Sequence, residues 1–331
     1  MPSSLSDMHV LVTGAGGFIG SHLVEALASQ GAQVRAFVRY NSRGDPGLLR
    51  LLPPDIFSSL EVVAGDLRDP QAVRAAVAGC QVVLHLGALI SIPYSYFHPV
   101  EVAETNFIGT LNVLMACRDL GVERLIHTST SEVYGTAKQV PISESHPLQG
   151  QSPYSASKIG ADKMAESFNC AYNLPVVTVR PFNTYGPRQS ARAVIPTIIT
   201  QALTRSTIRL GSLDTTRDFT FVEDTVAGFM AAAGTTGVEG GVFNLGVGQE
   251  IRVGDLAQKI IDKVGRPVEI QVTPERLRPE NSEVLRLISD NRLARERLGW
   301  FPQVGLDEGL DRTIKWISSN IERYQPDRYQ F

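Results

Sequence analysis

The chain has 331 residues, 43% hydrophobic and 20% charged, which is enough to bury one large core and a smaller one. Its formal net charge of −3 is small and neither sign is clustered, which argues against nucleic acid or a membrane surface as a partner. Three scattered cysteines, no signal peptide and no apolar run long enough to span a bilayer predict a soluble cytoplasmic protein.

Strand and helix patterns alternate from the start of the chain. A β-branched run at residues 9–13 precedes apolar residues at helical spacing over residues 18–30, and Gly31 ends this helix. A second strand is predicted at residues 33–38, and a third, LEVVAGD, ends at Asp66. The first of these units is a strand, a turn and a helix.

The alternation continues through the next sixty residues. Asp69 and Pro70 are typical of an N-cap and first helical residue, and predict a helix to about Val77. The strand VVLHLGA, a helical pattern over residues 100–120 and the strand RLIHTS follow. Near-continuous apolar strands linked by helices predict a parallel sheet covered on both faces. We therefore expect an α/β fold in which residues 1–180 form a Rossmann-type, doubly wound domain.

The pattern changes after about Arg180. Short strands broken by turns, as in RLGSLDTTRDFTFVEDT and VFNLGVGQEIRV, replace the regular alternation. We expect residues 181–331 to form a smaller, mixed α/β domain, with some of this chain returning to the Rossmann domain.

Gly14, Gly17 and Gly20 lie between the first strand and the first helix. Alone, such a triplet is a weak motif, because tight turns often contain glycine. Here it follows a strand and opens a helix, so the backbone can approach a pyrophosphate at the helix N-terminus. We therefore expect a dinucleotide-binding turn.

Two other segments follow strands at the edge where a dinucleotide binds. Asp66 could accept a hydrogen bond from an adenine amino group, or it could only cap a turn or helix. Leu86, Gly87 and Ala88 could let the backbone pass close to the cofactor.

Tyr154 and Lys158 are four residues apart in a predicted helix, so they share one face. A neighbouring ammonium would lower the pKa of the phenol from about 10, which would make it a usable acid or base. Taken alone, both could be ordinary surface residues. Together with the glycine turn and the hydroxyl-rich strand end HTSTSEVYG, they indicate a catalytic site.

These motifs, in this order and with RPFNTYGPR at residues 180–188, resemble the extended short-chain dehydrogenase/reductase family of nucleotide-sugar-modifying enzymes. The resemblance covers nearly the whole chain. It implies a tightly bound nicotinamide cofactor that takes a hydride from sugar C4 and later returns it. Tyr154 would remove the C4 hydroxyl proton, Lys158 would hold the cofactor ribose, and Thr130 would bind the C4 oxygen. The residues then expected around the cofactor are Gly14, Gly17, Phe18, Ile19, Gly20, Arg39, Asp66, Leu67, Leu86, Gly87, Ala88, Thr105, Tyr154 and Lys158.

The same resemblance implies that the second half of the chain binds a nucleotide-diphosphate sugar. Asn183 and Arg217 would contact the diphosphate, and Arg278 would reach a phosphate or the ribose. Guanidinium groups suit this task because they bind phosphate oxygens in a fork, although each arginine could instead be a solvated surface residue. The expected substrate-binding residues are Asn183, Arg188, Val194, Leu210, Arg217 and Arg278.

Glu132 is the residue that helps to distinguish which reaction of the family this chain catalyses. A 4-epimerase has no evident use for this carboxylate, whereas a base beside C5 of a 4-ketone can remove the C5 proton and expel the C6 hydroxyl as water. Deoxythymidine-diphosphate-glucose dehydratases carry Thr-Asp-Glu here, and this chain has Thr130-Ser131-Glu132, in which Ser131 is a poorer proton donor. Guanosine-diphosphate-mannose dehydratases and UDP-glucuronate decarboxylases resemble this Thr-Ser-Glu pattern.

Two longer segments favour dehydration. GPRQSARAVIPTIITQAL and RPENSEVLRLISDNRLARERLGW resemble the 4,6-dehydratases of the legionaminic-acid pathway, which act on a nucleotide-linked N-acetylglucosamine. We expect an NDP-sugar 4,6-dehydratase, with a UDP-glucuronate decarboxylase or, less favoured, a 4-epimerase as alternatives. Thr130, Tyr154 and Lys158 are all present, which argues against a non-catalytic sensor or scaffold, and the small net charge argues against RNA.

The cofactor and the assembly are also open to prediction. No acid follows the second strand, where NAD-binding domains usually carry one, and Arg39 could instead meet a 2′-phosphate. This favours NADP over NAD, although many dehydratases of this type use NAD.

Residues 100–120 and 154–172 are apolar on more than one helical face. In the family these helices form a four-helix bundle between two subunits, so we expect a homodimer.

Overall fold

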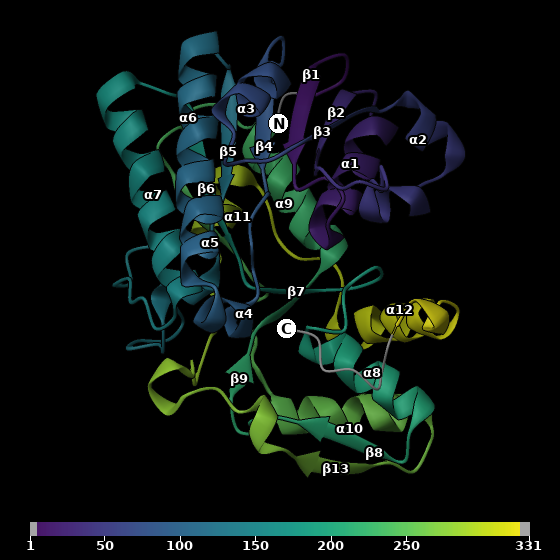
Figure 1. Cartoon of the computed structure of the whole chain (residues 1–331). Helices are drawn as coiled ribbons and strands as arrows, with labels where there is room; N and C mark the ends of the chain where they lie inside the picture. Colours follow the sequence, from purple (N-terminus) through teal and green to yellow (C-terminus); the bar gives the residue numbers. More distant parts are fainter. Residues whose placement is uncertain (1–4, 325–331) are drawn as a thin grey trace.

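The computed structural model describes residues 5–324 (Figure 1). Its main body is a seven-stranded parallel sheet with the order β11-β6-β5-β4-β1-β2-β3. The strands are β1 (His9–Thr13), β2 (Gln33–Arg39), β3 (Glu61–Gly65), β4 (Val82–His85), β5 (Arg124–Thr128), β6 (Val176–Pro181) and β11 (Val242–Leu245). The predicted Rossmann-type sheet is confirmed, and its edge strand β11 comes from the second half of the chain.

Helices cover both faces of this sheet (Figure 1). One face carries α3 (Pro70–Val77), α6 (Gly109–Leu120) and α7 (Pro153–Tyr172), and the other carries α1 (Phe18–Ser29), α9 (Val222–Gly234) and α11 (Arg292–Leu298). Successive residues of β1 alternate between the two cores: Leu11 packs under α3 and α6, whereas Val10 and Val12 pack against the opposite helices. Burial on both faces explains why apolar residues fill the middle of each strand and do not alternate with polar ones.

Shorter helices connect these elements. They are α2 (Pro54–Ser59), α4 (Ile92–Phe97) and α5 (Pro99–Ala103). The helix predicted over residues 100–120 is confirmed: α5, a π-helical turn at Glu104–Ile108 and α6 follow one another without a gap. The predicted N-cap of α3 is confirmed, because the Asp69 side chain accepts hydrogen bonds from the backbone N–H groups of Gln71 and Ala72.

The second half of the chain also forms a part that lies below the sheet in Figure 1. It contains the strand pairs β7 (Asn183–Tyr185) with β10 (Phe219–Phe221), β9 (Thr216–Arg217) with β12 (Ile251–Arg252), and β8 (Thr207–Leu210) with β13 (Glu269–Val272). Its helices are α8 (Val194–Thr204), α10 (Val253–Val264) and α12 (Leu306–Ser318). Ser282 joins it to the Rossmann part, because its hydroxyl lies 2.7 Å from the Tyr96 hydroxyl and donates to the Gln151 carbonyl at 2.6 Å.

No helix within residues 5–324 combines the length and the apolar character needed to cross a membrane.

Candidate active site

The predicted dinucleotide-binding turn lies between β1 and α1 and packs against the end of β4. Gly14 has a φ of +68°, and a Cβ there would lie 2.8 Å from the backbone nitrogen of Gly87. A Cβ on Gly20 would overlap the carbonyl oxygen of Gly14, so neither position admits a side chain. Gly17 is the N-cap of α1, and no side chain caps this helix. Its first N–H groups therefore remain available to an anion, and the turn fits a pyrophosphate.

The other uncharged cofactor candidates follow strands at the same edge or begin neighbouring helices. They are Phe18 and Ile19 at the start of α1, Leu67 after β3, Leu86, Gly87 and Ala88 after β4, and Thr105 in the π-helical turn. A Cβ on Gly87 would lie 2.7 Å from Cδ1 of Leu67, so the β3 and β4 loops are in close contact. The structure thus brings these candidates to one side of the sheet.

Two of the charged cofactor candidates, Asp66 and Arg39, have partners that the sequence did not predict. Arg68 donates to the two carboxylate oxygens of Asp66 at 3.0 and 2.7 Å, and these hydrogen bonds lower the pKa of Asp66 to about 2. The side chain of Arg39 is 63% exposed, and its guanidinium lies 3.3 Å from the carboxylate of Glu101. Asp66 is therefore ionised and already accepts hydrogen bonds, while Arg39 lies beside an acid.

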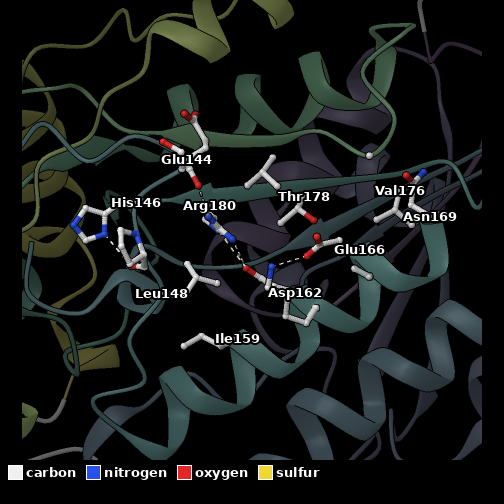
Figure 2. A pocket seen from close by; sticks show the side chains of 16 residues that line it. Glu144, His146, Leu148, Ile159, Asp162, Glu166, Asn169, Val176, Thr178 and Arg180 are labelled. Carbon is white, nitrogen blue, oxygen red and sulfur yellow. Dashed lines mark hydrogen bonds and ion pairs between the residues drawn. The ribbon is translucent and has the colours of Figure 1, made fainter. Parts of the chain in front are cut away.

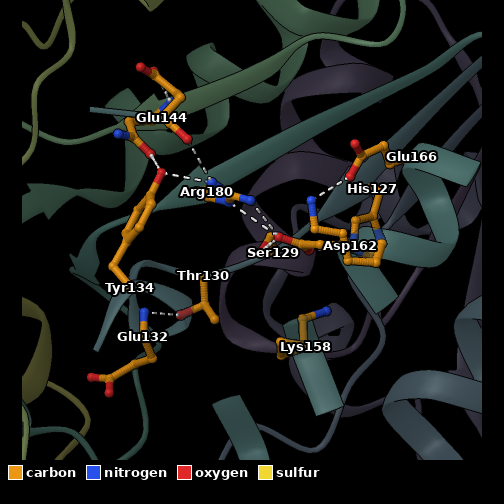
Figure 3. Close-up of polar contacts among 12 residues, drawn as sticks. His127, Ser129, Thr130, Glu132, Tyr134, Glu144, Lys158, Asp162, Glu166 and Arg180 are labelled. Carbon is orange, nitrogen blue, oxygen red and sulfur yellow. Dashed lines mark hydrogen bonds and ion pairs between the residues drawn. The ribbon is translucent and has the colours of Figure 1, made fainter. Parts of the chain in front are cut away.

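The stretch that contains Glu132 is a 3₁₀ turn after the end of β5. The Thr130 side chain caps this turn by accepting a hydrogen bond from the Glu132 N–H at 3.2 Å. Ser131 is buried and Glu132 half-buried. No hydrogen bond or ion pair holds the Glu132 carboxylate among residues 5–324, and in Figure 3 it points away from the buried polar side chains above it. It is a carboxylate that a ligand can reach.

Tyr154 and Lys158 lie one turn apart in α7, and both are buried. The Lys158 ammonium donates to the Thr128 carbonyl at 2.6 Å. Burial lowers the pKa of Lys158 to about 8, and the charge of Asp162 opposes this shift. Burial raises the pKa of the Tyr154 phenol, although a hydrogen bond with Thr130 works in the other direction. The phenol pKa therefore moves opposite to the lowering that the sequence predicted, because desolvation outweighs the hydrogen bond with Thr130 and the charges of Glu132 and Asp162 add to the increase.

The structure brings two of the predicted diphosphate-binding arginines together. Arg217 in β9 and Arg278 lie 3.2 and 3.5 Å from the same carboxylate oxygen of Glu283. Burial lowers the pKa of Arg217, and the charges of Glu132 and Glu283 act against this. Asn183 lies in β7, and its side chain donates to the carbonyl of Asp218 at 3.4 Å. Glu283 was missed by the sequence analysis, and only its position five residues after Arg278 could have suggested it.

Three other predicted substrate residues have structural partners. Arg188 has a φ of +68°, and its guanidinium donates to Glu25 of α1 at 2.6 Å, so it ties the segment after β7 to the first helix. Val194 begins α8 and packs against the main core, and Leu210 ends β8 inside that core. Among residues 5–324, Arg188 makes no ion pair with Glu283.

A buried polar network that the sequence did not predict lies behind the Thr130 turn (Figure 3). The Asp162 carboxylate accepts hydrogen bonds from the side chains of His127, Ser129 and Arg180. Arg180 also donates to the Tyr134 hydroxyl at 2.9 Å and lies over its ring. These side chains come from β5, β6, α7 and the 3₁₀ turn, so they connect the elements that carry the candidate catalytic residues.

A cavity of about 540 Å³ lies on the other side of this network (Figure 2). It is lined by residues of the 144–148 segment, of α7 and of β6, and Asp162 and Arg180 form part of its wall. Thr130, Glu132, Tyr154 and Lys158 do not line it. It is therefore separate from the candidate active site.

Comparison with known proteins places the chain in a family. The sequence profile described as GDP-mannose 4,6 dehydratase matches residues 11–313. A UDP-glucose 4-epimerase of Mycolicibacterium smegmatis is 36% identical over 95% of this chain and 100% of the relative, and a dTDP-glucose 4,6-dehydratase of Streptomyces antibioticus is 32% identical over 96% and 95%. The solved structure of DesIV, a dTDP-glucose 4,6-dehydratase from Streptomyces venezuelae with NAD and TYD bound, has a TM-score of 0.88 and 31% identity, and the match covers 97% of this chain and 100% of DesIV.

These matches confirm the resemblance seen in the sequence. The profile covers most of the chain, and relatives above 30% identity align with it almost end to end. The chain belongs to the GDP-mannose 4,6-dehydratase family, within the extended short-chain dehydrogenases/reductases that modify nucleotide sugars.

Proposed function

We propose that this protein is an NDP-sugar 4,6-dehydratase that uses a bound nicotinamide cofactor. The observation that carries the proposal is the Glu132 carboxylate, which has no protein partner among the described residues and lies on the same turn as Thr130. Its charge also acts on Arg217, a residue of the proposed diphosphate site. An unpaired carboxylate at this place supports a base that works on the sugar.

The first half-reaction is oxidation at C4. A bound nicotinamide would supply the acceptor, and later the donor, of a hydride. The glycine turn would hold its pyrophosphate, and Lys158 its ribose hydroxyls. Tyr154 would take the proton of the C4 hydroxyl while Thr130 donates a hydrogen bond to the C4 oxygen, which agrees with the interaction between these two side chains.

The second step distinguishes a dehydratase from its relatives. A 4-ketone makes the C5 proton acidic, so the Glu132 carboxylate can remove it. The C6 hydroxyl would then leave as water, taking the proton that Glu132 removed, with Ser131 relaying it either directly or through a water molecule. The product would form when the hydride is returned to C6 and C5 regains a proton from solvent. Arg217 and Arg278 would hold the diphosphate, with Glu283 fixing the two guanidinium groups side by side.

The substrate proposed here is a nucleotide-linked N-acetylglucosamine or a related hexose, as the segments after residue 186 suggest. A 4-epimerase is the second candidate, because the relative that is 36% identical is a UDP-glucose 4-epimerase. A UDP-glucuronate decarboxylase is a third, since the solved neighbour MoeE5 was crystallised with UDP-glucuronic acid and NAD.

A panel of sugar nucleotides read by mass spectrometry tests the proposal. UDP-N-acetylglucosamine, its GDP analogue, UDP-glucose, dTDP-glucose and UDP-glucuronic acid would be incubated with the purified protein. Loss of water supports a dehydratase. Loss of carbon dioxide would instead identify a decarboxylase, an isomer of unchanged mass an epimerase, and no conversion at all a non-catalytic protein.

The choice between NAD and NADP depends on Arg39. Its exposed guanidinium can meet a 2′-phosphate, which favours NADP, whereas Glu101 competes for the same positive charge. DesIV, solved with NAD, is a neighbour that argues for the other cofactor. Mass spectrometry of the nucleotide released by denaturation tests this choice. NADP would support the role of Arg39, and NAD alone would contradict it.

We also propose a homodimer located in the cytoplasm. Ile108 and Met115 leave an apolar stripe exposed beside α7, which supports burial against a second copy. Cys80, Cys117 and Cys170 are all free thiols, which supports a reducing compartment. Cell fractionation would test the location.

A further inference from the structure

Asp162 is a buried carboxylate for which the reaction above has no use, and it lies in α7 one turn after Lys158. It is 5% exposed. Its Oδ1 lies 3.0 Å from Nε2 of His127, and its Oδ2 accepts from the Ser129 hydroxyl at 2.8 Å and from Arg180 at 2.9 Å. Tyr154, Lys158 and Asp162 therefore form one stripe along α7, in which the third member faces the strands (Figure 3).

The groups that Asp162 holds are next to the proposed catalytic residues in the chain. Ser129 directly precedes Thr130, and His127 precedes Thr128, whose carbonyl accepts the Lys158 ammonium. Arg180 lies in β6, three residues before Asn183. One carboxylate thus joins the ends of β5 and β6 to the helix that carries Tyr154 and Lys158.

The charges around Asp162 are unbalanced without it. Arg180 and Lys158 are buried cations on β6 and α7. His127 on β5 and His85 on β4 stack on each other, and burial lowers the pKa of both, so they are neutral at pH 7. Burial alone would raise the pKa of Asp162, but the hydrogen bond from His127 and the charge of Arg180 bring it to about 2. Asp162 is therefore the anion that faces these two cations from α7, while Glu144 approaches Arg180 only from the cavity side.

We propose that Asp162 is a positioning residue for the reaction: through Ser129 and His127 it fixes the Thr130 turn against α7, and it places a negative charge one helical turn from the Lys158 ammonium. This inference rests on the proposed function, because it assigns Asp162 to the same site. The competing interpretation is a purely structural ion pair with Arg180, whose loss would lower stability and leave the chemistry of the folded protein unchanged.

The first test is Asp162→Asn, compared with Asp162→Glu and with the control Asp224→Asn. Asp224 is also buried, its carboxylate accepts hydrogen bonds from the backbone N–H groups of Gln303 and Val304, and it lies in α9 on the other face of the sheet. For Asp162→Asn we expect kcat to fall on the order of 10- to 100-fold, with a smaller change in KM. The alkaline limb of the kcat–pH profile should move to lower pH, because Lys158 loses the charge that favours its protonated form. Asp162→Glu should recover part of kcat, and Asp224→Asn should leave the pH profile in place.

A second test uses the cavity of about 540 Å³ that Asp162 borders (Figure 2). Asp162→Ala enlarges this space, so added formate can enter and replace the missing carboxylate. We expect formate to raise kcat of Asp162→Ala several-fold while leaving Lys158→Ala unchanged. A folded Asp162→Asn protein with wild-type kcat and an unshifted pH profile would overturn the proposal. So would failure of both Asp162→Asn and Asp162→Ala to fold while Asp162→Glu and Asp224→Asn fold, since the role would then be structural.

A third readout separates this inference from the proposed function. The chain has six lysines, so the Lys158 side chain can be followed by NMR in protein labelled at lysine, with Lys158→Arg to assign the signal. We expect Lys158 to titrate at lower pH in Asp162→Asn than in the wild-type protein. If the wild-type protein converts no sugar nucleotide, the proposed function fails, yet this titration still decides whether Asp162 controls the charge of Lys158.

Discussion

At the scale of single residues, Glu132 decides which reaction the site performs. Glu132→Gln keeps the size and hydrogen bonding of the side chain but removes the base. Oxidation at C4 does not need this carboxylate, so the variant should still reduce its bound nicotinamide when substrate is added, visible as absorbance. Water loss should fall by about 10²–10⁴-fold, the usual cost of losing a general base. Glu123→Gln, an exposed residue just before β5, is the matched control.

Deuterium exchange at C5 gives a second test of the elimination step. Elimination through a C5 carbanion-like species must exchange the C5 hydrogen, so the wild-type product formed in deuterium oxide should carry deuterium at C5. Thr130 already caps the turn, so a capping role for the Glu132 side chain is not needed in this structure. Near-wild-type water loss by the folded Glu132→Gln protein would show that Glu132 is not the base.

The buried Lys158 ammonium should lower the free energy of unfolding, although the proposed reaction needs this residue. Its pKa is about 8 in the folded protein against 10.5 for an ordinary lysine, so between these values the unfolded chain holds a proton that the folded chain has lost. The free energy of unfolding therefore rises with pH over this range, and below pH 8 the buried ammonium costs up to about 3 kcal/mol.

Lys158→Met should consequently raise the free energy of unfolding at pH 7. The lost hydrogen bond to Thr128 offsets about 1 kcal/mol of this gain, and Asp162 keeps Arg180 and His127 as partners. Denaturant titrations from pH 6 to about 10.5 should show the difference between variant and wild type shrinking as pH rises. A variant that is less stable than the wild type at pH 7 would show that the buried Lys158 ammonium does not destabilise the folded protein.

At the scale of elements, the junction of β1 and α1 should tolerate no side chain at Gly14 or Gly20. Gly20→Ala would force a Cβ into the Gly14 carbonyl, so we expect a loss of about 1–3 kcal/mol in unfolding free energy and loss of the co-purifying nicotinamide. Gly305→Ala is the control, because that glycine is the N-cap of α12 and a Cβ there meets no atom within 4 Å. Thermal unfolding and the absorbance of released cofactor measure both effects; equal behaviour of the two variants would mean that the turn is not tightly packed.

The helices and strands also show which features of the fold can be predicted from sequence patterns. The order of strands and helices, the glycine turn and the Tyr154–Lys158 pair follow from local rules of spacing, and the structure places them as expected. The π turn inside the 100–120 helix was not predicted, because a single turn of wider pitch is too short to change the apolar pattern of the whole helix.

Contacts between distant segments were out of reach for a different reason. Glu283 lies 66 residues from Arg217, and Arg188 lies 163 residues from Glu25, so only the folded chain brings these charges together. The direction of the Tyr154 pKa shift depends on burial by several elements, and the sequence showed only the neighbouring lysine. The spacing of Asp162, four residues after Lys158, is visible in the sequence. Its hydrogen-bond partners on β5 and β6 could not be predicted from the sequence.

At the scale of the whole molecule, the exposed apolar stripe on α6 should be buried in a homodimer. Ile108 and Met115 are 40% and 41% exposed and lie on one helical face with the half-buried Leu111. A stable interface needs about 800 Å² from each partner, and the neighbouring α7 offers the surface to extend this stripe. Ile108→Glu combined with Met115→Glu would place two charges in the interface, so we expect a dimer for the wild type and a folded monomer for this variant by light scattering. Val272→Glu, on the distant strand β13 and 46% exposed, should remain dimeric. A wild-type protein that is monomeric at micromolar concentration would show that this stripe is an ordinary solvated surface.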